Sequence, residues 1–151
     1  MDIDEKFMKL AIKEAKKAEA LDEVPIGAVL VIDNTVISRG HNVRETKKDP
    51  LGHAEIIAIK KASKKLDAWR LSDATLYVTI EPCLMCAGAI IQSRIKRVVF
   101  GAPDFKGGAF GSSINVLDSK NINHHPEIVS GVLKDSCSEI ITNFFKKKRI
   151  S

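Results

Sequence analysis

The chain has 151 residues, the usual size of one domain, and its 44% hydrophobic and 28% charged residues suffice for a buried core under a charged surface. This composition excludes collagen, a coiled coil and intrinsic disorder, and the longest apolar run, 25–32, is far shorter than the roughly 20 residues of a membrane-spanning helix. The net charge of +5 favours a polyanionic partner, because an excess of Lys and Arg attracts phosphate groups.

The N-terminus and the cysteines both indicate a cytoplasmic protein. The first residues are rich in acids, whereas a secretory signal carries basic residues and then an apolar stretch. Three cysteines, two of them in a Cys-x-x-Cys pair, do not describe a disulfide framework. In a reducing compartment, Cys83 and Cys86 indicate metal or redox chemistry. Cys137 lies in an apolar helical pattern, is most simply a small buried hydrophobe, and is assigned no function.

The first half of the chain predicts two helices and a hairpin. Apolar positions spaced for one helical face predict a helix over 4–21. Two β-rich runs, 26–32 and 35–38, flank Asp33 and Asn34, which are typical of a two-residue hairpin turn, so we expect antiparallel strands. A second helix is predicted over 53–66, with its lysines mostly on the outer side.

The second half predicts a βαβ unit and a basic C-terminal helix. We expect a strand over 74–80, a helix over 83–93 and a strand over 97–100, then a short strand near 127–130 and a last helix from about 133 to 147. The whole chain, 1–151, is thus predicted as a single α/β domain, with one five-stranded mixed sheet between helices. The basic end, 133–151, either complements the helix dipole or contacts phosphate, and the sequence leaves both open.

Two short strings carry the chemistry, and both lie at predicted helix starts. Cysteines three residues apart on a helix lie about 60° apart around its axis, so Cys83 and Cys86 can bind one ion. With a neutral His53 they would give three ligands, cancel the charge of Zn²⁺ and leave the fourth tetrahedral position for water, which is typical of a catalytic site. Three other histidines could instead close the site as a structural one: His41, His124 and His125.

Glu55 fits this site as a proton carrier. It lies two residues after His53, about 200° away around a helix, so the two cannot share one helical stripe. Side chains of a first turn can nevertheless converge beyond the helix end. A carboxylate beside an activated water accepts a proton and later donates it.

The strings His53-Ala54-Glu55 and Pro82-Cys83-Leu84-Met85-Cys86 resemble the signature of zinc-dependent nucleobase deaminases, His-x-Glu followed by Pro-Cys-x-x-Cys. Beyond the signature, the chain resembles the bacterial tRNA-specific adenosine deaminases nearly end to end. The final double-Phe basic helix separates this family from the guanine deaminases, which share the signature. The stretches that carry the resemblance are 23–29, 40–42, 73–90, 97–102, 123–124 and 144–149.

The resemblance implies a three-layer α/β/α fold like that of cytidine deaminase and a hydrolytic deamination of adenosine to inosine. The substrate is the wobble position of a tRNA anticodon, in most bacteria an arginine tRNA, and the enzyme is a homodimer with one Zn²⁺ per subunit. The resemblance assigns the metal to His53, Cys83 and Cys86, and the proton shuttle to Glu55.

Three further residues match substrate contacts of the family. Asn42 corresponds to a residue that hydrogen-bonds the flipped base, Asp104 to one that contacts a neighbouring ribose, and Phe145 to one that packs near the flanking nucleotides. Without the resemblance they would be a turn residue, a loop residue and an apolar anchor. Phe105 and Phe110 stand where relatives have smaller residues, so we expect a reshaped pocket rim.

Three alternatives stay open from the sequence. The first is a small-molecule deaminase, of guanine in particular, which would need no basic surface. The second is a non-catalytic zinc-binding subunit that positions RNA for a partner, although Glu55 argues against it, since such subunits typically lack the catalytic carboxylate. The third is a redox pair formed by Cys83 and Cys86.

Overall fold

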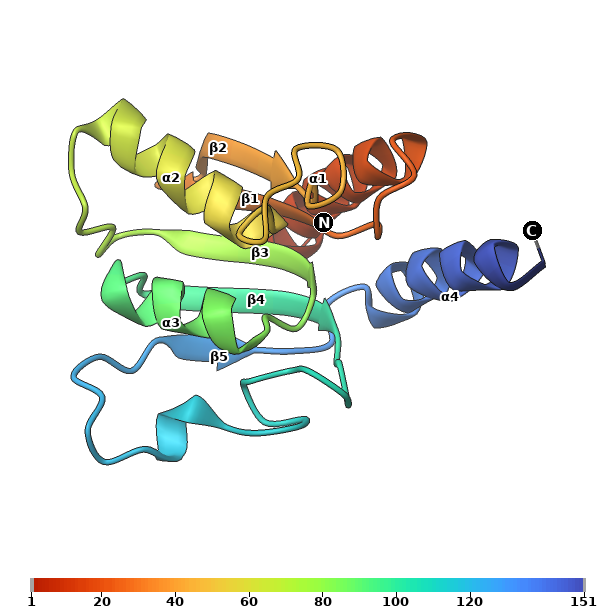
Figure 1. Ribbon diagram of the computed structural model, residues 1–151. Coiled ribbons are helices and arrows are strands. Elements are labelled where there is room, and N and C mark those ends of the chain that lie inside the picture. Colours follow the sequence, from red (N-terminus) through yellow and green to blue (C-terminus); the bar gives the residue numbers. More distant parts are fainter. Residues whose placement is uncertain (1, 151) are drawn as a thin grey trace.

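Five strands form one mixed sheet in the computed structural model, which describes residues 2–150 (Figure 1). The strands are β1 (Gly27–Ile32), β2 (Thr35–His41), β3 (Thr75–Ile80), β4 (Arg97–Ala102) and β5 (Glu127–Val129), in the order β2-β1-β3-β4-β5. β1 is antiparallel to β2 and to β3, whereas β3, β4 and β5 run parallel to one another. The predicted five-stranded mixed sheet is confirmed.

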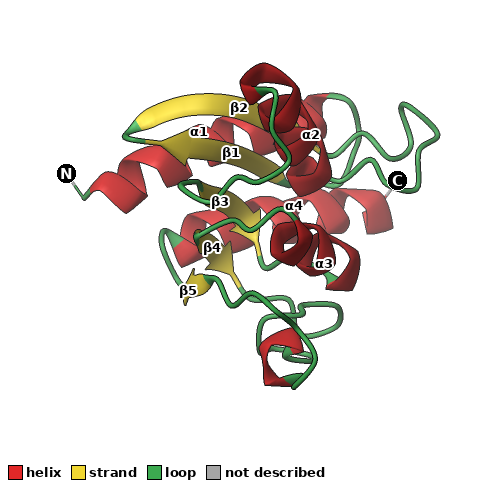
Figure 2. Cartoon of the chain, turned by 90° about the vertical axis from the view of Figure 1, so that its left-hand side faces the viewer, coloured by secondary structure: helices red, strands yellow, loops and turns green. Residues whose placement is uncertain are grey.

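Helices cover both faces of this sheet. Figure 2 shows α2 (Ala54–Leu66) and α3 (Leu84–Gln92) on one side, and α1 (Ile3–Ala20) and α4 (Lys134–Ile150) on the other. A short 3₁₀ turn, η1 (Val116–Asp118), lies between β4 and β5. The predicted three-layer α/β/α arrangement is therefore correct.

The uninterrupted apolar run of β1 follows from burial on both faces. Ala28 and Leu30 pack in the core cluster under α2 and α3, whereas Val29 and Val31 pack in the cluster that contains Met8 of α1. Successive side chains of a strand point to opposite faces, so a strand buried on both sides needs an apolar residue at each position.

The hairpin turn is confirmed, but the end predicted for β2 is wrong. Asp33 and Asn34 both have positive φ, 49° and 60°, as a two-residue turn of the favoured type requires. We predicted that the second strand ends at Ser38; it continues to His41, because Gly40 pairs with Ala28 of β1. A Cβ at Gly40 would lie 2.4 Å from the Ala54 carbonyl oxygen, so only glycine lets α2 pack this closely on β2.

Other element ends shift by a few residues. β4 continues past Phe100 to Ala102 on its pairing with β3, and α4 extends three residues beyond the predicted end at 147. Cys137 is buried in the core between α4 and the sheet, as predicted. Within 2–150, no helix combines the length and the apolar content needed to cross a membrane.

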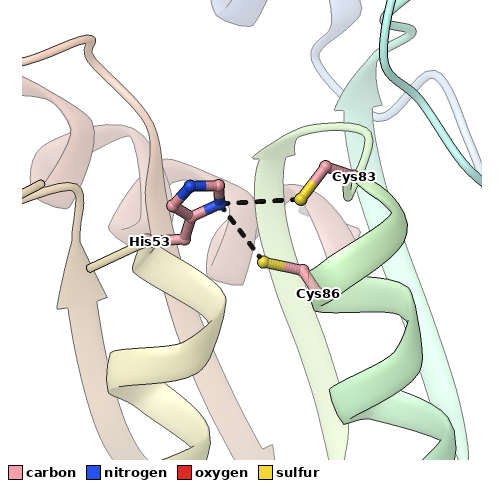
Figure 3. Close-up of side chains that lie close together, drawn as sticks. All are labelled: His53, Cys83 and Cys86. Atoms are coloured by element: carbon pink, nitrogen blue, oxygen red, sulfur yellow. Dashed lines mark hydrogen bonds between the residues drawn. The ribbon is translucent and has the colours of Figure 1, made fainter. Parts of the chain in front are cut away.

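The fold brings two helix starts together. β3 leads through a three-residue link into α3, and α2 begins after the long loop that follows β2. Both helices pack on the same face of the sheet, and their N-termini lie side by side at the edge where β3 and β4 end (Figures 1 and 3). Ligands of α/β sheets bind at such carboxyl ends of strands.

Candidate active site

Three side chains with metal-binding atoms converge at these helix starts. The Nδ1 atom of His53 lies 3.6 Å from the Sγ atom of Cys83 and 3.5 Å from that of Cys86 (Figure 3). Bonds of about 2.0 Å from zinc to nitrogen and about 2.3 Å to sulfur, at a tetrahedral angle, separate the two ligand atoms by about 3.5 Å. The three residues thus have the spacing of Zn²⁺ ligands.

Two of these residues are the N-cap residues of helices, but their side chains do not cap the helices. His53 and Cys83 are the N-cap residues of α2 and α3, both with extended backbone, and neither side chain bonds to the N–H groups of its own helix. A Ser, Asp or Asn at such a position would turn its side chain back to the helix. Here, the imidazole and the thiol point across the gap between the helices instead (Figure 3).

The other histidines lie outside this cluster. His41 Nδ1 is 3.2 Å from Glu14 Oε1, and His124 Nε2 is 2.7 Å from the Ile95 carbonyl oxygen. Among residues 2–150, His53, Cys83 and Cys86 are the only group of three or more such side chains that could hold a metal ion. Three protein ligands are typical of catalytic zinc sites, whereas structural sites have four.

The two thiols differ in their ionisation. A hydrogen bond from the Cys86 thiol lowers the pKa of Cys83 to about 4 and raises the pKa of Cys86. The interaction with Cys83 in turn raises the pKa of His53. Cys83 is therefore a thiolate at neutral pH, and the thiolate is the form that binds a metal.

Glu55 lies beside the cluster in the first turn of α2. Only 4% of its surface is exposed, and its carboxyl interacts with the Cys86 thiol. Burial raises the pKa of Glu55 to about 7. A carboxyl group with a pKa near neutrality can both accept and donate a proton.

A pocket of about 150 Å³ opens over His53, Glu55 and Cys83. Its volume is well below the roughly 300–1,000 Å³ of pockets for drug-sized ligands, so it suits a group as small as one base. Asn42 lines it and is held on both sides: its amide donates to the Val24 carbonyl oxygen (3.3 Å), and its Oδ1 accepts from the Arg44 N–H (3.2 Å).

A larger groove of about 800 Å³ adjoins the pocket, and Asp104 lines both. Phe145 lines the groove and not the pocket. Three cationic side chains also line the groove: Lys106, Lys148 and Arg149. Aromatic rings between basic side chains are typical of surfaces that bind single-stranded nucleic acid.

The two phenylalanines expected at the rim have different positions. Phe105 lines the groove with 76% of its surface exposed. Phe110 is 8% exposed and packs in the core cluster under α2 and α3, so its predicted place on the rim is wrong. Its N–H bonds to the Glu81 carboxylate, which turns this part of the loop inward.

Two buried carboxylates hold the loops around the pocket, and neither was predicted from the sequence as part of the site. Glu81, at the end of β3, accepts hydrogen bonds from the N–H groups of Asp104 (3.1 Å), Phe110 (3.0 Å) and Ser112 (3.2 Å). Glu23 accepts from Glu45 and Thr46. Burial alone would raise the pKa of Glu23, but these hydrogen bonds hold it below its usual range. An acid that directly follows an apolar strand, as Glu81 does, is the sequence signal that could have identified it.

Comparison with known proteins gives a consistent result. Residues 1–149 match the family model of the MafB19-like deaminases. The tRNA-specific adenosine deaminase of Bacillus subtilis is 54% identical over 149 residues, which cover 99% of this chain and 92% of that protein. A solved structure from a study of A-to-I editing by tRNA:A34 deaminases at the wobble position of transfer RNA has a TM-score of 0.87 at 46% identity and covers 89% of this chain and 98% of that one.

A guanine deaminase is a weaker match. The structure of this enzyme from Bacillus subtilis superposes with a TM-score of 0.64 at 34% identity and covers 77% of this chain and 85% of that one. The higher identity, the wider coverage and the higher TM-score favour the tRNA-specific adenosine deaminases over the guanine deaminase.

Proposed function

The chain belongs to the family of the tRNA-specific adenosine deaminases, and on this premise we propose that it hydrolyses adenosine to inosine at the wobble position of a tRNA anticodon. One observation carries the proposal: a small pocket over His53, Glu55 and Cys83 opens into a basic groove with two exposed aromatic rings. A free base would use only the pocket, whereas an RNA loop would also use the groove.

We propose that His53, Cys83 and Cys86 hold one Zn²⁺ ion per subunit. The geometry favours zinc, because the nitrogen-to-sulfur distances of 3.5 and 3.6 Å match a tetrahedral ion. A Zn²⁺ ion bound there would supply Lewis acidity, which brings the pKa of a water in its open position down toward 7.

Glu55 is the proposed proton carrier of the reaction. Its carboxylate takes a proton from the attacking water, whose oxygen bonds to the amino-bearing carbon of the base. Glu55 passes this proton to the ring nitrogen. It then takes the remaining proton from the new hydroxyl group and passes it to the amino group, and the carbon–nitrogen bond breaks to release ammonia and leave a carbonyl on the base. Its burial keeps the carboxyl away from bulk water, which would otherwise compete for the proton.

Asn42, Asp104 and Phe145 are the proposed substrate contacts. The Asn42 amide lines the pocket where the Watson–Crick edge of a flipped base would lie. Asp104 stands where pocket and groove meet, as a contact to the neighbouring ribose requires. Phe145, 44% exposed, offers a ring to a flanking nucleotide.

The proposal extends to the assembly and the location of the enzyme. We propose a cytoplasmic homodimer, a single deaminase domain over 1–151 with 133–151 as its basic C-terminal part, and an arginine tRNA as substrate. Two leucines near the starts of α2 and α3 are exposed, Leu51 (54%) and Leu84 (59%). They support the dimer, because a second subunit that packs beside the site would bury these apolar side chains. Sedimentation at micromolar concentration tests the dimer, and a monomer would contradict it.

The deciding experiment incubates the zinc-loaded protein with an arginine tRNA transcript that bears a wobble adenosine. Sequencing then locates inosine, and parallel reactions with free guanine and cytidine measure ammonia. We expect conversion at the wobble position only, lost in Glu55→Ala. Release of ammonia from guanine without conversion of the tRNA would establish the free-base alternative. Bound tRNA without inosine would establish a non-catalytic subunit, and a chain that holds no zinc would favour the redox pair.

A further inference from the structure

A cationic pocket lies where β3, β4 and β5 begin, at the edge of the sheet opposite to the catalytic pocket. Its volume is about 410 Å³. All of its lining residues come from the segments that precede these three strands, and none of them is acidic. We call it the edge pocket, and it is lined by Arg70, Ser72, Arg94, Lys96, His124 and His125.

The positive charges of the edge pocket have no carboxylate partner. Within residues 2–150, no ion pair joins a carboxylate to Arg70, Arg94 or Lys96. Cations gathered without a counter-charge repel one another, and an anion that enters between them relieves this repulsion. The composition of the pocket therefore favours an anionic ligand.

Part of the edge pocket is held rigidly. Arg94 donates from Nη1 to the Ile91 carbonyl oxygen (3.0 Å) and to Asn123 Oδ1 (3.1 Å). The guanidinium carbons of Arg70 and Arg94 lie 4.8 and 6.0 Å from the ring centre of Trp69, which is itself 57% exposed. An exposed ring beside guanidinium groups is a combination that binds nucleic acid by stacking and charge.

Exposed lysines occupy the half of α2 that is farther from the catalytic pocket. α2 begins beside His53 and ends shortly before Arg70, and Figure 1 shows its C-terminal end at the same edge of the molecule as the starts of β3 and β4. Its thirteen residues span about 20 Å. Four lysines on this helix are exposed: Lys60, Lys61, Lys64 and Lys65.

We propose that the edge pocket binds a backbone phosphate of the RNA substrate, at a distance from the nucleotide that enters the catalytic pocket. This inference rests on the proposed RNA substrate. A free base cannot reach both pockets, because they are separated by about the length of α2. A folded RNA can, and its phosphates would follow the lysines of α2 to Arg70 and Lys96.

The test compares two variants that remove the same charge. Arg70→Gln/Lys96→Gln changes exposed side chains of the edge pocket and leaves the hydrogen-bonded Arg94 in place. Lys13→Gln/Lys16→Gln removes two exposed cations from α1, on the other face of the sheet. Fluorescence anisotropy measures the affinity for the arginine tRNA from 50 to 200 mM salt, and steady-state kinetics follow inosine formation.

We expect the edge-pocket variant to flatten the slope of log K against log salt concentration by about 1 to 2 relative to the wild type. Its KM for the tRNA should rise while kcat at saturation stays unchanged, and the α1 variant should show less than half of these effects. The same slope and KM in both variants would overturn the inference.

Further outcomes separate this inference from the proposed function. A wild-type protein that edits the tRNA, with an edge-pocket variant equal to it, would overturn only the edge-pocket site. A wild type that neither binds nor edits the tRNA would overturn both. Calorimetry with inorganic phosphate identifies the source of the anion. If phosphate binds the wild type but not the edge-pocket variant, and the two proteins have the same affinity for the tRNA, the pocket binds free phosphate. This result would contradict the RNA contact.

Discussion

At the scale of single residues, the chemistry of Glu55 depends on its place in the first turn of α2. The free N–H groups of a helix start favour a carboxylate, whereas burial favours the neutral acid. Burial is the larger effect here, and the pKa of Glu55 lies at about 7. His53, two residues earlier, is the N-cap residue of α2, and its imidazole faces Cys83 and Cys86 instead of capping the helix. One helix start thus places an imidazole in the cluster and a titratable carboxyl beside it.

Glu55→Gln keeps the size of the side chain and removes its ability to carry a proton. We expect the rate of inosine formation in single turnovers to fall by about 10²- to 10⁴-fold or more. Zinc content should stay at the wild-type level, because Glu55 is not among the three clustered ligands. Metal analysis and single-turnover kinetics on the same preparation check both points. A loss of less than tenfold would remove Glu55 from the mechanism.

Cys83→Ala and Cys137→Ala form a matched pair for the metal. Both remove one thiol, but only Cys83 faces His53, whereas Cys137 is packed between α4 and the sheet. We expect Cys83→Ala to lose zinc and activity and Cys137→Ala to retain a full complement of zinc. Mass spectrometry of the metal after gel filtration measures this. Equal zinc loss in both variants would show that the effect comes from damage to the fold.

At the scale of elements, the sequence predicted what is local and missed what depends on contacts across the chain. The helices and the hairpin turn follow from periodicity and from Asp33 and Asn34. The end of β2 does not follow from the sequence, because a glycine suggests that a strand ends there. Only the structure shows that Gly40 leaves the space that α2 needs to pack on β2. The cluster of His53, Cys83 and Cys86 could be predicted because the spacing of these residues along the chain is itself the signal. Glu81 was missed because its partners lie 23 to 31 residues away.

Glu81→Gln tests whether this buried carboxylate positions the pocket rim. A glutamine keeps one acceptor oxygen but turns an NH₂ group toward N–H donors, so at least one of the three loop hydrogen bonds is lost. We expect a loss of stability of about 1–3 kcal/mol and a higher KM for the tRNA, because Asp104 moves. Hydrogen exchange should rise over 104–112.

A control for Glu81→Gln is Glu139→Gln, which removes a carboxylate from the exposed side of α4. It should change neither the exchange of 104–112 nor the KM. If Glu81→Gln lowered the unfolding free energy without faster exchange in this loop, Glu81 would stabilise the fold but would not hold the rim.

At the scale of the whole molecule, α2 runs from the end of the sheet with the catalytic pocket to the end with the edge pocket. The catalytic pocket lies where β3 and β4 end, and the edge pocket where they begin. α1 is tied to the middle of this sheet through Asp4. Its carboxylate accepts from Arg97 Nη1 (2.8 Å) and Nη2 (2.6 Å) and from the Tyr77 hydroxyl (2.8 Å). A paired, two-bond contact of this kind is among the stronger polar interactions in proteins.

Asp4→Asn tests this tie through the pH dependence of stability. The hydrogen bonds from Arg97 hold the pKa of Asp4 below its usual 3.8. A carboxyl group whose pKa is lower in the folded state stabilises the fold above its unfolded pKa, and this stabilisation is lost as the pH falls through the folded pKa. We therefore expect Asp4→Asn to lower the free energy of unfolding by about 1–3 kcal/mol at pH 7.

The difference between the wild type and Asp4→Asn should shrink as the pH falls below 3.8. Urea unfolding of both proteins at a series of pH values measures it, and protonation of the shared metal cluster cancels because both chains contain it. Glu139→Gln, whose carboxyl is exposed, should have the same free energy of unfolding as the wild type at pH 7. A difference that stays constant down to pH 3 would mean that Asp4 acts through packing. The contribution of its charge to stability would instead be lost when the carboxyl group is protonated.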